Sequence, residues 1–501
     1  MKSNFLGATY QAITPVLGTD TCINLYAERR PDKQTGEVGA FIGTPGKAKI
    51  INVGSTGQGR ALVPLGINFG VLVAVVGNTV YEVDLVFPGP YNQTKVTTIG
   101  TLPDSTGAVD VVSNYTQAAV ATSQGIYWWT QGTPGLSLVA GTNPNLSPGV
   151  IPPLAYLDGY GCFVLGGGGV ASPDVFGVLN LGDLSTFNAL NVAEAEALPD
   201  GINNIISTLR EIWILGSESI EIWSDTGAAA FPFERIPGGV LGIGSGAGAA
   251  LLDGTIYWMT PDYKVARSVG YQFEYISTPS VELALRRVAN NKDLAVGLFK
   301  SKAYTYKADG HAFYVLNAGP YLTLVYDATT GLWHQRAART ANGALVADII
   351  GPILDTSAPF YSGLAPVLAL GQQDGNIYAL DPGTYTDNGN PIYRERTWQV
   401  MDPQEINRIR IDRLELDAET GVGNETGTDT DPQVWLDMSF DGGRTFGTSR
   451  YQSLGKVGIY NNVPTWKRCG MGRRPVARLA TTAQVKIAWA GVNLSGEVLQ
   501  Q

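Results

Sequence analysis

The chain repeats a short strand-turn pattern, and this repetition constrains its fold more than any other feature. Each copy places a glycine or polar turn before β-branched residues that alternate with Tyr, Trp or an acid, as in antiparallel hairpins. The copies occupy residues 77–81, 124–128, 219–223, 253–258 and 374–378, with a looser one at 325–333. They recur at roughly 35–65 residues, which brackets the ~40–50 residues of a propeller blade. The pattern predicts an all-β propeller of about six blades.

Composition agrees with a protein built from short strands. The chain has 62 Gly and 28 Pro, and 16% of its residues are charged, which argues against a helical bundle or a disordered chain. The formal net charge of −10 excludes a general nucleic-acid binder. Cys22, Cys162 and Cys469 stand far apart without a CxxC pair, so we expect isolated thiols. The N-terminus lacks the apolar core of a signal peptide, so we expect a soluble protein made in a cytoplasm.

The density of strand signals divides the chain into three segments. Residues 1–50 carry few strand signals and are expected to form an extended N-terminal lead-in that packs on the body. Residues 51–390 are expected to form the propeller, with long loops around 133–153 and 173–200. Near-helical apolar spacing predicts one short helix over residues 280–290.

Longer alternating strands follow residue 390. Apolar and charged residues alternate over 409–417, 433–440 and 484–489, which indicates a sheet with one solvent-exposed face. Residues 391–501 are therefore expected to form an additional C-terminal antiparallel β-sheet region. The acidic, Gly/Thr-rich stretch 419–432 is expected to be an exposed, mobile loop.

Signals for catalysis are absent from the sequence. The chain has two histidines, His311 and His334, and neither lies in a nucleophile or metal motif. The alternating glycines at 242–248 superficially resemble a phosphate-binding loop, but a hairpin rather than a helix follows them. We therefore expect no enzyme, no metal and no cofactor.

One compact motif resembles the Asp-box, S-x-D-x-G-x-T-[FW], of sialidases and related propellers. In such a box the carboxylate accepts backbone N–H groups and a glycine supplies an unusual φ, so the motif locks a hairpin. A single copy lies outside the expected blades and is interpreted as a structural hairpin box; its residues are Ser439, Asp441, Gly443, Thr445 and Phe446.

A basic segment follows the box. No acidic residue occurs between positions 442 and 496, which is unusual in an acidic protein. Such a stretch suits contact with phosphate or with an acidic partner surface; alternatively it is a basic sheet face balanced by the acidic blades of the same chain. The candidate partner- or DNA-binding residues are Arg444, Arg450, Lys456, Lys467, Arg468, Arg473, Arg474, Arg478 and Lys486.

Four stretches, taken in order, resemble one family. Residues 466–474 match a W-K-R-x-G-x-x-R-R signature of tail hub proteins of short-tailed bacteriophages, also called packaged-DNA stabilisation or tail nozzle proteins. Residues 198–223 look like the family's P-D-G-I…G-S-x-(S/T)-I-E-x-(aromatic) core. Residues 248–259 look like its blade-opening hairpin, and residues 24–26 with 43–46 look like its N-terminal pair.

The resemblance implies a six-bladed propeller hub, present as a hexameric ring below the portal and adaptor rings of the virion. It implies a structural protein that continues the DNA channel, helps retain packaged DNA and offers attachment for fibres or spikes. The partners would be copies of itself, the tail adaptor or head-completion protein, a tail fibre or spike, and genomic DNA passing through the lumen, close to the host cell surface. Assembly would take place in the host cytoplasm.

Two other classes stay open on the sequence. One is a glycan-cleaving, sialidase-like propeller enzyme, which needs an Arg cluster, a Tyr and paired carboxylates around a pocket. The other is a propeller binding module, lectin-like or protein-interacting. Glycosidase activity and the mass of the chain in solution would discriminate between these classes and a ring-forming hub.

Overall fold

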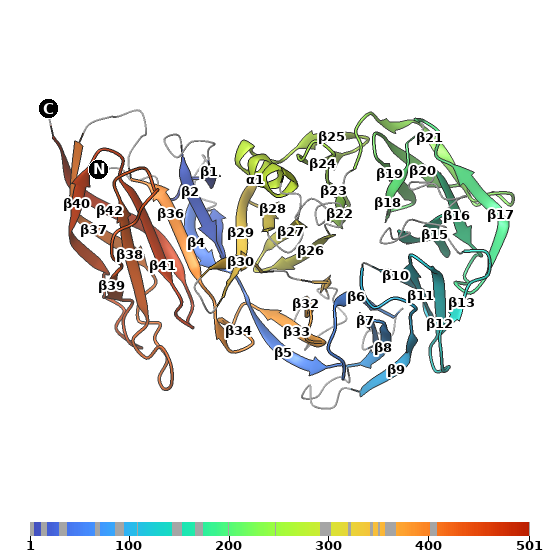
Figure 1. The fold of residues 1–501 in the computed structure, drawn as a ribbon, viewed down its shortest axis with the longest axis horizontal. Helices are drawn as coiled ribbons and strands as arrows, with labels where there is room; N and C mark the ends of the chain where they lie inside the picture. Colours follow the sequence, from blue (N-terminus) through green and yellow to red (C-terminus); the bar gives the residue numbers. More distant parts are fainter. Residues whose placement is uncertain are drawn as a thin grey trace.

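The fold was analysed in a computed structural model of the 501-residue chain. The structure describes residues 5–11, 18–29, 38–65, 71–85, 95–107, 109–142, 153–165, 174–198, 200–245, 247–290, 302–318, 322–340, 344–348, 351–355, 367–400 and 408–499. A ring of small sheets forms most of the molecule, and a sandwich of two larger sheets stands at one side of the ring (Figure 1).

Within the described residues, the ring consists of seven four-stranded antiparallel units. The first four are β6 to β9 (Gly59–Pro64, Val71–Val76, Thr79–Asp84, Lys95–Thr101), β10 to β13 (Asp110–Ser113, Gln117–Thr122, Gly125–Thr130, Ser137–Leu138), β14 to β17 (Leu154–Leu157, Tyr160–Val164, Val175–Leu179, Phe187–Glu194) and β18 to β21 (Ile202–Thr208, Glu211–Gly216, Ile220–Asp225, Phe233–Leu241). The last three are β22 to β25 (Ala247–Leu252, Thr255–Met259, Val265–Val269, Gln272–Tyr275), β26 to β29 (Lys302–Ala308, His311–Ala318, Leu322–Asp327, Leu332–Arg339) and β31, β32, β33 and β5 (Ile353–Asp355, Val367–Leu370, Asn376–Asp381, Gly46–Asn52).

The propeller therefore has seven blades, one more than the expected six. The innermost strands β6, β10, β14, β18, β22, β26 and β31 contact one another in this order, and β31 contacts β6 to close the ring. The third blade is the one that the repeat missed. Its first hairpin turns at Asp158 and Gly159, both with positive φ, and continues into Tyr160, Gly161 and Cys162 without a β-branched residue. The expected long loop at 173–200 contains this blade's strands β16 and β17.

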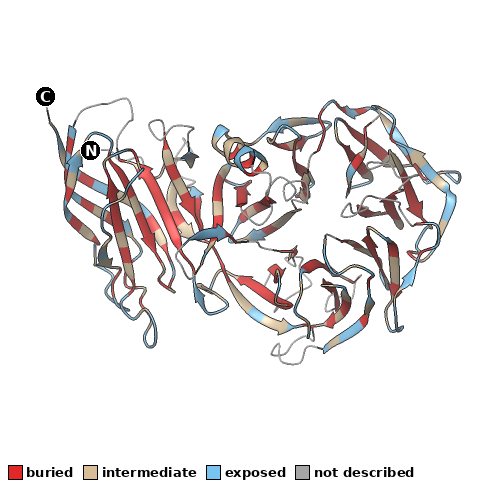
Figure 2. Cartoon of the chain, in the orientation of Figure 1, coloured by how far each residue is buried: buried red, intermediate tan, exposed pale blue. Residues whose placement is uncertain are grey.

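The blades bury their inner and middle strands between neighbours. Strand β7, Val71–Val76, is buried at every position because adjacent blades cover both of its faces. Figure 2 shows buried residues concentrated in these strands, whereas exposed residues prevail on the outermost strand β17. Apolar packing between blades is therefore what holds the ring together.

The N-terminal segment is divided between the two parts of the molecule, which corrects the expectation of a packed lead-in. Strand β5 (46–52) pairs antiparallel with β33 and supplies the outermost strand of the seventh blade. Strands β2, β3 and β4 instead enter the sandwich. These pairings join residues more than 300 positions apart, so the local sequence pattern did not reveal them.

The propeller axis is crossed by a side chain. Lys302, at the start of β26 in the sixth blade, donates from Nζ to the carbonyl oxygen of Val109, before β10 in the second blade, at 2.8 Å. Asp110 lies beside this ammonium group, and its own carboxylate accepts the N–H of Leu154 at 2.9 Å. The second and sixth blades are not neighbours in the ring. At this level the ring is therefore filled by protein.

The expected helix is confirmed as α1, Pro279–Asn290, the one helix in the described part of the chain. Its buried residues Val281, Leu285 and Val288 pack against the fifth and sixth blades. Gly248 lies within strand β22, so the described part of the glycine run is followed by a strand and not by the helix that a phosphate-binding loop requires.

The sandwich comprises two five-stranded layers. One contains β2 (Thr19–Ile23), β36 (Arg394–Gln399), β41 (Val476–Thr481), β38 (Gln433–Ser439) and β39 (Arg450–Ser453). The other contains β3 (Leu25–Arg29), β4 (Val38–Gly43), β42 (Ala488–Leu499), β37 (Arg408–Ala418) and β40 (Thr465–Gly472). Short strands β1 (Tyr10–Gln11), β30 (Leu345–Ala347), β34 (Thr386–Asp387) and β35 (Asn390–Pro391) pair at the margins of these and the blade sheets.

Strands were expected at 409–417 and 433–440 and are observed as β37 and β38; the one expected at 484–489 begins at 488, as β42. The first layer of the sandwich continues the sixth blade, because β2 pairs with β29 in parallel through Ile23 and Gln335.

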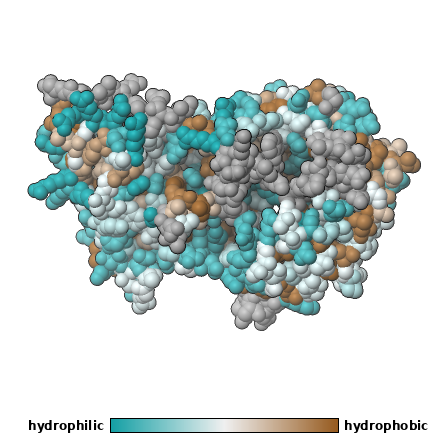
Figure 3. All heavy atoms as spheres, in the orientation of Figure 1, coloured by the Kyte–Doolittle hydropathy of each residue, from teal (hydrophilic) through white to brown (hydrophobic). Residues whose placement is uncertain are grey.

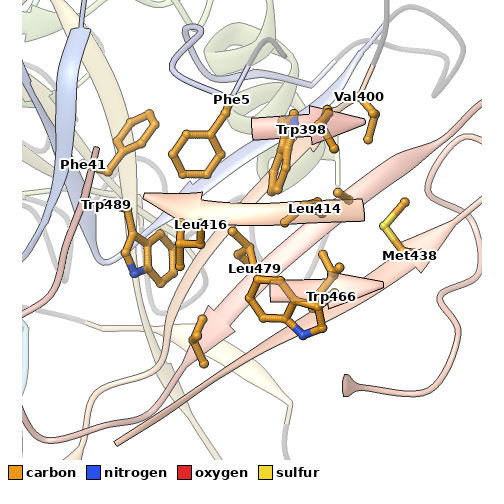
Figure 4. Close-up of a cluster of buried hydrophobic side chains, with 14 of the residues drawn as sticks. Phe5, Phe41, Trp398, Val400, Leu414, Leu416, Met438, Trp466, Leu479 and Trp489 are labelled. Atoms are coloured by element: carbon orange, nitrogen blue, oxygen red, sulfur yellow. The ribbon is translucent and has the colours of Figure 1, made fainter. Parts of the chain in front are cut away.

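Aromatic side chains fill the sandwich core. Trp466 and Trp489 are fully buried, and Trp398 meets the ring of Phe5 edge-on at a centroid distance of 4.9 Å (Figure 4). Phe5 meets Phe41 in the same way at 5.7 Å. Residues from the beginning and the end of the chain thus share one core, so the sandwich requires both.

Candidate interaction surfaces on the sandwich

The nine basic residues that the sequence singled out all lie on the sandwich, but they have different surroundings. Arg478, on β41, forms an ion pair with the buried Asp437 at 2.7 Å and covers the ring of Phe446 at 4.0 Å. Lys486 pairs with Glu419 at 2.9 Å. These two side chains are occupied within the fold.

Arg450 connects the edges of the two layers. Its guanidinium donates to the carbonyl oxygens of Lys467 at 2.6 Å and Arg468 at 3.3 Å. The indole N–H of Trp466 donates in return to the carbonyl of Arg450 at 2.6 Å. Arg450 therefore closes the open side of the sandwich, where β39 faces β40.

The other six basic side chains are exposed, and no carboxylate partner is seen for them within the described residues. Arg473 and Arg474 form the turn between β40 and β41, and the N–H of Gly442 donates to the carbonyl of Arg474 at 3.2 Å. This bond places Arg444, in the same loop as Gly442, at the same end of the sandwich. Lys467 and Arg468 lie on the edge strand β40, whereas Lys456 lies in a loop at the opposite end.

The residues of the W-K-R-x-G-x-x-R-R stretch fall into two groups, those that are buried in the core and those that are exposed. Trp466 is a core residue, and Gly470 and Gly472 leave room for the ring of Phe440. A Cβ on Gly472 would lie 2.5 Å from Cβ of Phe440. The tryptophan and glycines of this stretch thus serve packing, and its arginines remain free on the surface.

The hairpin box forms a closed set of hydrogen bonds around Asp441. Its carboxylate accepts the N–H of Arg444 at 2.9 Å, the N–H of Thr445 at 3.0 Å and the hydroxyl of Thr445 at 2.6 Å. The hydroxyl of Ser439 donates to the same carboxylate at 2.7 Å. The hydroxyls of Thr445 and Ser439, with these N–H groups, hold the pKa of Asp441 well below its usual range. The carboxylate oxygens of Asp441 thus accept hydrogen bonds from within the turn, and these bonds fix the loop that carries Arg444.

A cavity of about 500 Å³ lies where the seventh blade meets the sandwich. Lys47, Asp348, Asp387, Tyr378 and Tyr393 are among its lining residues. Lys47 Nζ lies 2.8 Å from a carboxylate oxygen of Asp348 and 3.7 Å from one of Asp387. Burial opposes the charged form of Lys47, but the two carboxylates outweigh it and raise the pKa of the ammonium group.

Asp348 is therefore held in an ion pair with Lys47, whereas Asp387 keeps one buried oxygen without a hydrogen-bond partner among the described residues, and burial raises the pKa of its carboxyl group. Arg336 also lies 3.4 Å from Asp348. The cavity lies beside the seventh blade, and the carboxylates of Asp348 and Asp387 both face Lys47 in it.

The two histidines are internal parts of the sixth blade. His311 Nδ1 lies 2.8 Å from Asp327, whose carboxylate also accepts the hydroxyl of Thr330 at 2.7 Å. His334 is buried, and burial followed by the charge of Arg336 lowers its pKa to about 3. Neither ring joins a group of three or more potential metal ligands in the described chain. The three cysteines are buried and unpaired.

The sequence reasoning missed an exposed apolar loop on the sandwich. Val457, Ile459, Tyr460 and Val463 are all at least 46% exposed and lie on one loop between β39 and β40. The available signal was their clustering within seven positions of a stretch rich in Gly and Asn. That signal does not distinguish exposed from buried apolar residues. No helix of the described residues has the length and apolarity needed to cross a bilayer.

The chain thus combines a β-propeller with a β-sandwich that carries free basic side chains. Two family models match the chain, one described as bacteriophage P22 Gp10, beta-propeller, over residues 8–341, and one as bacteriophage P22 Gp10, beta-sandwich, over residues 393–497. The chain belongs to this family. It is a structural protein of the phage virion tail, and the resemblance found in the sequence is confirmed.

The chain is 10% identical to the WD40 β-propeller domain of Doa1, a crystal structure, with a TM-score of 0.35 over 67% of this chain and 98% of that one. No curated protein sequence matches the chain.

Proposed function

We propose that this protein forms the hub, or nozzle, of a short phage tail, as a hexameric ring below the portal and adaptor rings. In this position it continues the DNA channel, helps to retain packaged DNA and offers attachment for fibres or spikes. The observation that supports this proposal best is the match of both the propeller and the sandwich to a phage tail family. The ring is assembled in the host cytoplasm.

The filled propeller axis bears on the route of DNA. Because Lys302 reaches Val109 across the ring, duplex DNA does not thread a single propeller. The lumen of the hub is instead enclosed by several copies. With a formal net charge of −10 per chain, acidic lumen walls would repel DNA and let it slide during ejection.

The basic turn supports a contact with a neighbouring subunit or ring. Arg473 and Arg474 are exposed and carry no internal partner among the described residues, unlike Arg478. Two adjacent unpaired guanidiniums suit carboxylates on another protein. A basic rim of this kind changes association rate and salt dependence more than folding stability.

Charge reversal tests this assignment. The variant R473E/R474E is expected to fold and to be lost from particles, with virion yield reduced. The control is R286E/R287E, a tandem arginine pair exposed on helix α1 in which Arg286 contacts Glu282 at 3.8 Å; it is expected to assemble normally. Normal incorporation of R473E/R474E with genome leakage would instead assign the arginines to DNA phosphates. Unchanged yield and DNA retention would refute both roles.

Position in the virion is tested directly by microscopy. Negative-stain images of lysate particles, labelled with an antibody against residues 419–432, are expected to show label at the tail vertex. A soluble, monomeric chain absent from particles would refute the hub and would favour a glycan-binding or glycan-cleaving propeller. Glycosidase assays on generic substrates would then separate those two alternatives.

A further inference from the structure

The two ends of the sandwich carry opposite charges. One end, here called the basic end, is formed by Arg408, Arg444, Met471, Arg473, Arg474 and Val498. Register places these together, because Ile409 pairs with both Gly472 and Val498, next to the turn at 473–474. At this end Glu497 forms an ion pair with Arg410 at 3.1 Å, and the carboxylate of Asp441 is occupied by hydrogen bonds within the hairpin box. Met471 and Val498 are 43% and 42% exposed, so the end combines charge with apolar surface. Figure 3 shows hydrophilic and hydrophobic residues side by side on the part of the sandwich near the C-terminus.

The other end is acidic and more apolar. This acidic end is formed by Glu425, Asp429, Asp431, Val457, Ile459, Tyr460 and Val463. Its three acids outnumber Lys456, and the nearby Glu419 and Lys486 neutralise each other. Tyr460 is 76% exposed, the highest fraction among these apolar side chains.

Hydrogen bonds join the two loops of the acidic end into one surface. Thr420 Oγ1 donates to the carbonyl of Tyr460 at 2.9 Å, and the N–H of Gly421 donates to the carbonyl of Leu454 at 3.0 Å. Asp429 accepts the N–H of Gln484 at 2.9 Å. A set of large apolar side chains displayed on a hydrogen-bonded loop, rimmed by charge, is typical of a protein contact site.

The ends lie on opposite sides of the layer. Strand β37 runs from Arg408 at the basic end to Ala418 at the acidic end, a span of about 30–35 Å for a strand of this length. The two ends carry opposite charges, and each has exposed apolar groups. One end of a chain can therefore bind the other end of an identical chain in a head-to-tail contact. Such a contact closes into a ring when the rotation between copies permits it.

We propose that the acidic end of one copy docks on the basic end of the next copy. In this contact the apolar loop with Tyr460 packs against Met471 and Val498, and Arg473 and Arg474 face the acids of the neighbour. This contact rests on the proposed function because it assumes that several copies form one ring. It identifies the surfaces that hold those copies together. DNA is a poor occupant of the acidic end because its phosphates carry the same sign of charge.

Cysteine cross-linking on assembled particles tests the contact. Val457 and Met471 are exposed at opposite ends, and the native cysteines are buried, so the variant V457C/M471C presents one new thiol at each end. Treatment with a short bifunctional maleimide is expected to give a ladder of oligomers on a denaturing gel. The single variants V457C and M471C should give none, and V457C/V269C, with its second thiol on β24 of the propeller, should also give none.

Each outcome has a distinct meaning. A ladder restricted to V457C/M471C supports the head-to-tail contact. Dimers from a single-cysteine variant would replace it with a symmetric contact, and a band joining the chain to another virion protein would assign that end to the adaptor or a fibre. The chain present at the tail vertex without any cross-link would overturn this inference and leave the proposed function standing. Absence of the chain from particles would overturn both.

Discussion

Asn24 and Ala337 hold each other by two reciprocal hydrogen bonds although 313 positions separate them. The side-chain amide of Asn24 donates to the carbonyl of Ala337 at 2.6 Å, and the N–H of Ala337 donates to the side-chain oxygen of Asn24 at 3.1 Å. The same amide donates to the carbonyl of Tyr393 at 2.7 Å. Asn24 thus joins the N-terminal segment, the sixth blade and the beginning of the C-terminal segment at one buried point.

Substitution N24A should therefore destabilise the whole chain. It leaves the N–H of Ala337 and two carbonyl groups without their partner, at a cost of about 1–3 kcal/mol for each buried group that stays unsatisfied. Asn24 also adopts φ 52°, a left-handed conformation that Ala tolerates poorly. Denaturant unfolding should show a lower midpoint for N24A, whereas N461A, at an exposed loop position, should match the wild type. Equal midpoints for both variants would contradict the role of this junction.

Removal of Arg478 should destabilise the sandwich, unlike removal of the arginines in the neighbouring turn. Asp437 is buried, and R478A would leave its carboxylate without the guanidinium that pairs with it. We expect a loss of about 2–4 kcal/mol for R478A. The double variant R473A/R474A should stay within about 0.5 kcal/mol of the wild type, as is usual for exposed positions. Urea titration followed by tryptophan fluorescence measures both, and the reverse order of effects would refute the division of roles.

A methyl group at Gly472 should be costly because Phe440 occupies the space. The added Cβ would lie 2.5 Å from Cβ of Phe440, so one of the two strands must move. Overpacking of this kind costs about 1–3 kcal/mol. G491A is the matched control, since no heavy atom lies within 4 Å of the position of its added Cβ. F440L keeps the Cβ and Cγ atoms that meet the added methyl group, so it should leave the unfolding midpoint of G472A low, and a restored midpoint would place the strain at the outer ring atoms of Phe440 instead.

Asp441 should make stability depend on pH in the acid range. Its hydrogen bonds lower the pKa of the folded-state carboxylate, so it stabilises the fold above its unfolded pKa of about 3.9 and loses this contribution as pH falls toward the folded value. D441N should lower the thermal midpoint modestly, by less than about 1 kcal/mol in free energy, because the group is exposed. The difference from the wild type should be present at about pH 7 and shrink below about pH 4.

The control for this pH dependence is D417N, at an exposed position on β37. Its thermal midpoint should follow that of the wild type across the same pH range. A difference between D441N and the wild type that persists or grows in acid would show that the box acts through its shape alone.

Most blades could be predicted because a hairpin is specified locally. A turn glycine and the β-branched and aromatic residues after it lie within a few positions of one another, so the local sequence favours the hairpin by itself. The third blade lacked this signature after Gly159, and the seventh blade takes its outer strand from residues 46–52, so the number of blades did not follow from the repeat. Helix α1 was predictable for the same local reason as the hairpins.

The candidate surfaces were only partly predictable. The absence of acidic residues between 442 and 496 marked the basic segment, but nothing in the sequence distinguished Arg478, paired with Asp437, from Arg473 and Arg474. The acidic loop at 419–432 and the apolar loop at 457–463 also gave no sign that they share one end of the sandwich.

The sequence by itself determined the hairpins, the helix, the segregation of charge and the family, because each depends on residues that are close in the chain or in a preserved order. The tertiary structure alone decided the number of blades, the strands that the N-terminus gives to the sandwich, and which basic side chains remain free. The N-terminal strands pair with residues more than 300 positions away, and Arg478 meets Asp437 across two strands, so these features are chosen by the burial of the whole core rather than by any local pattern.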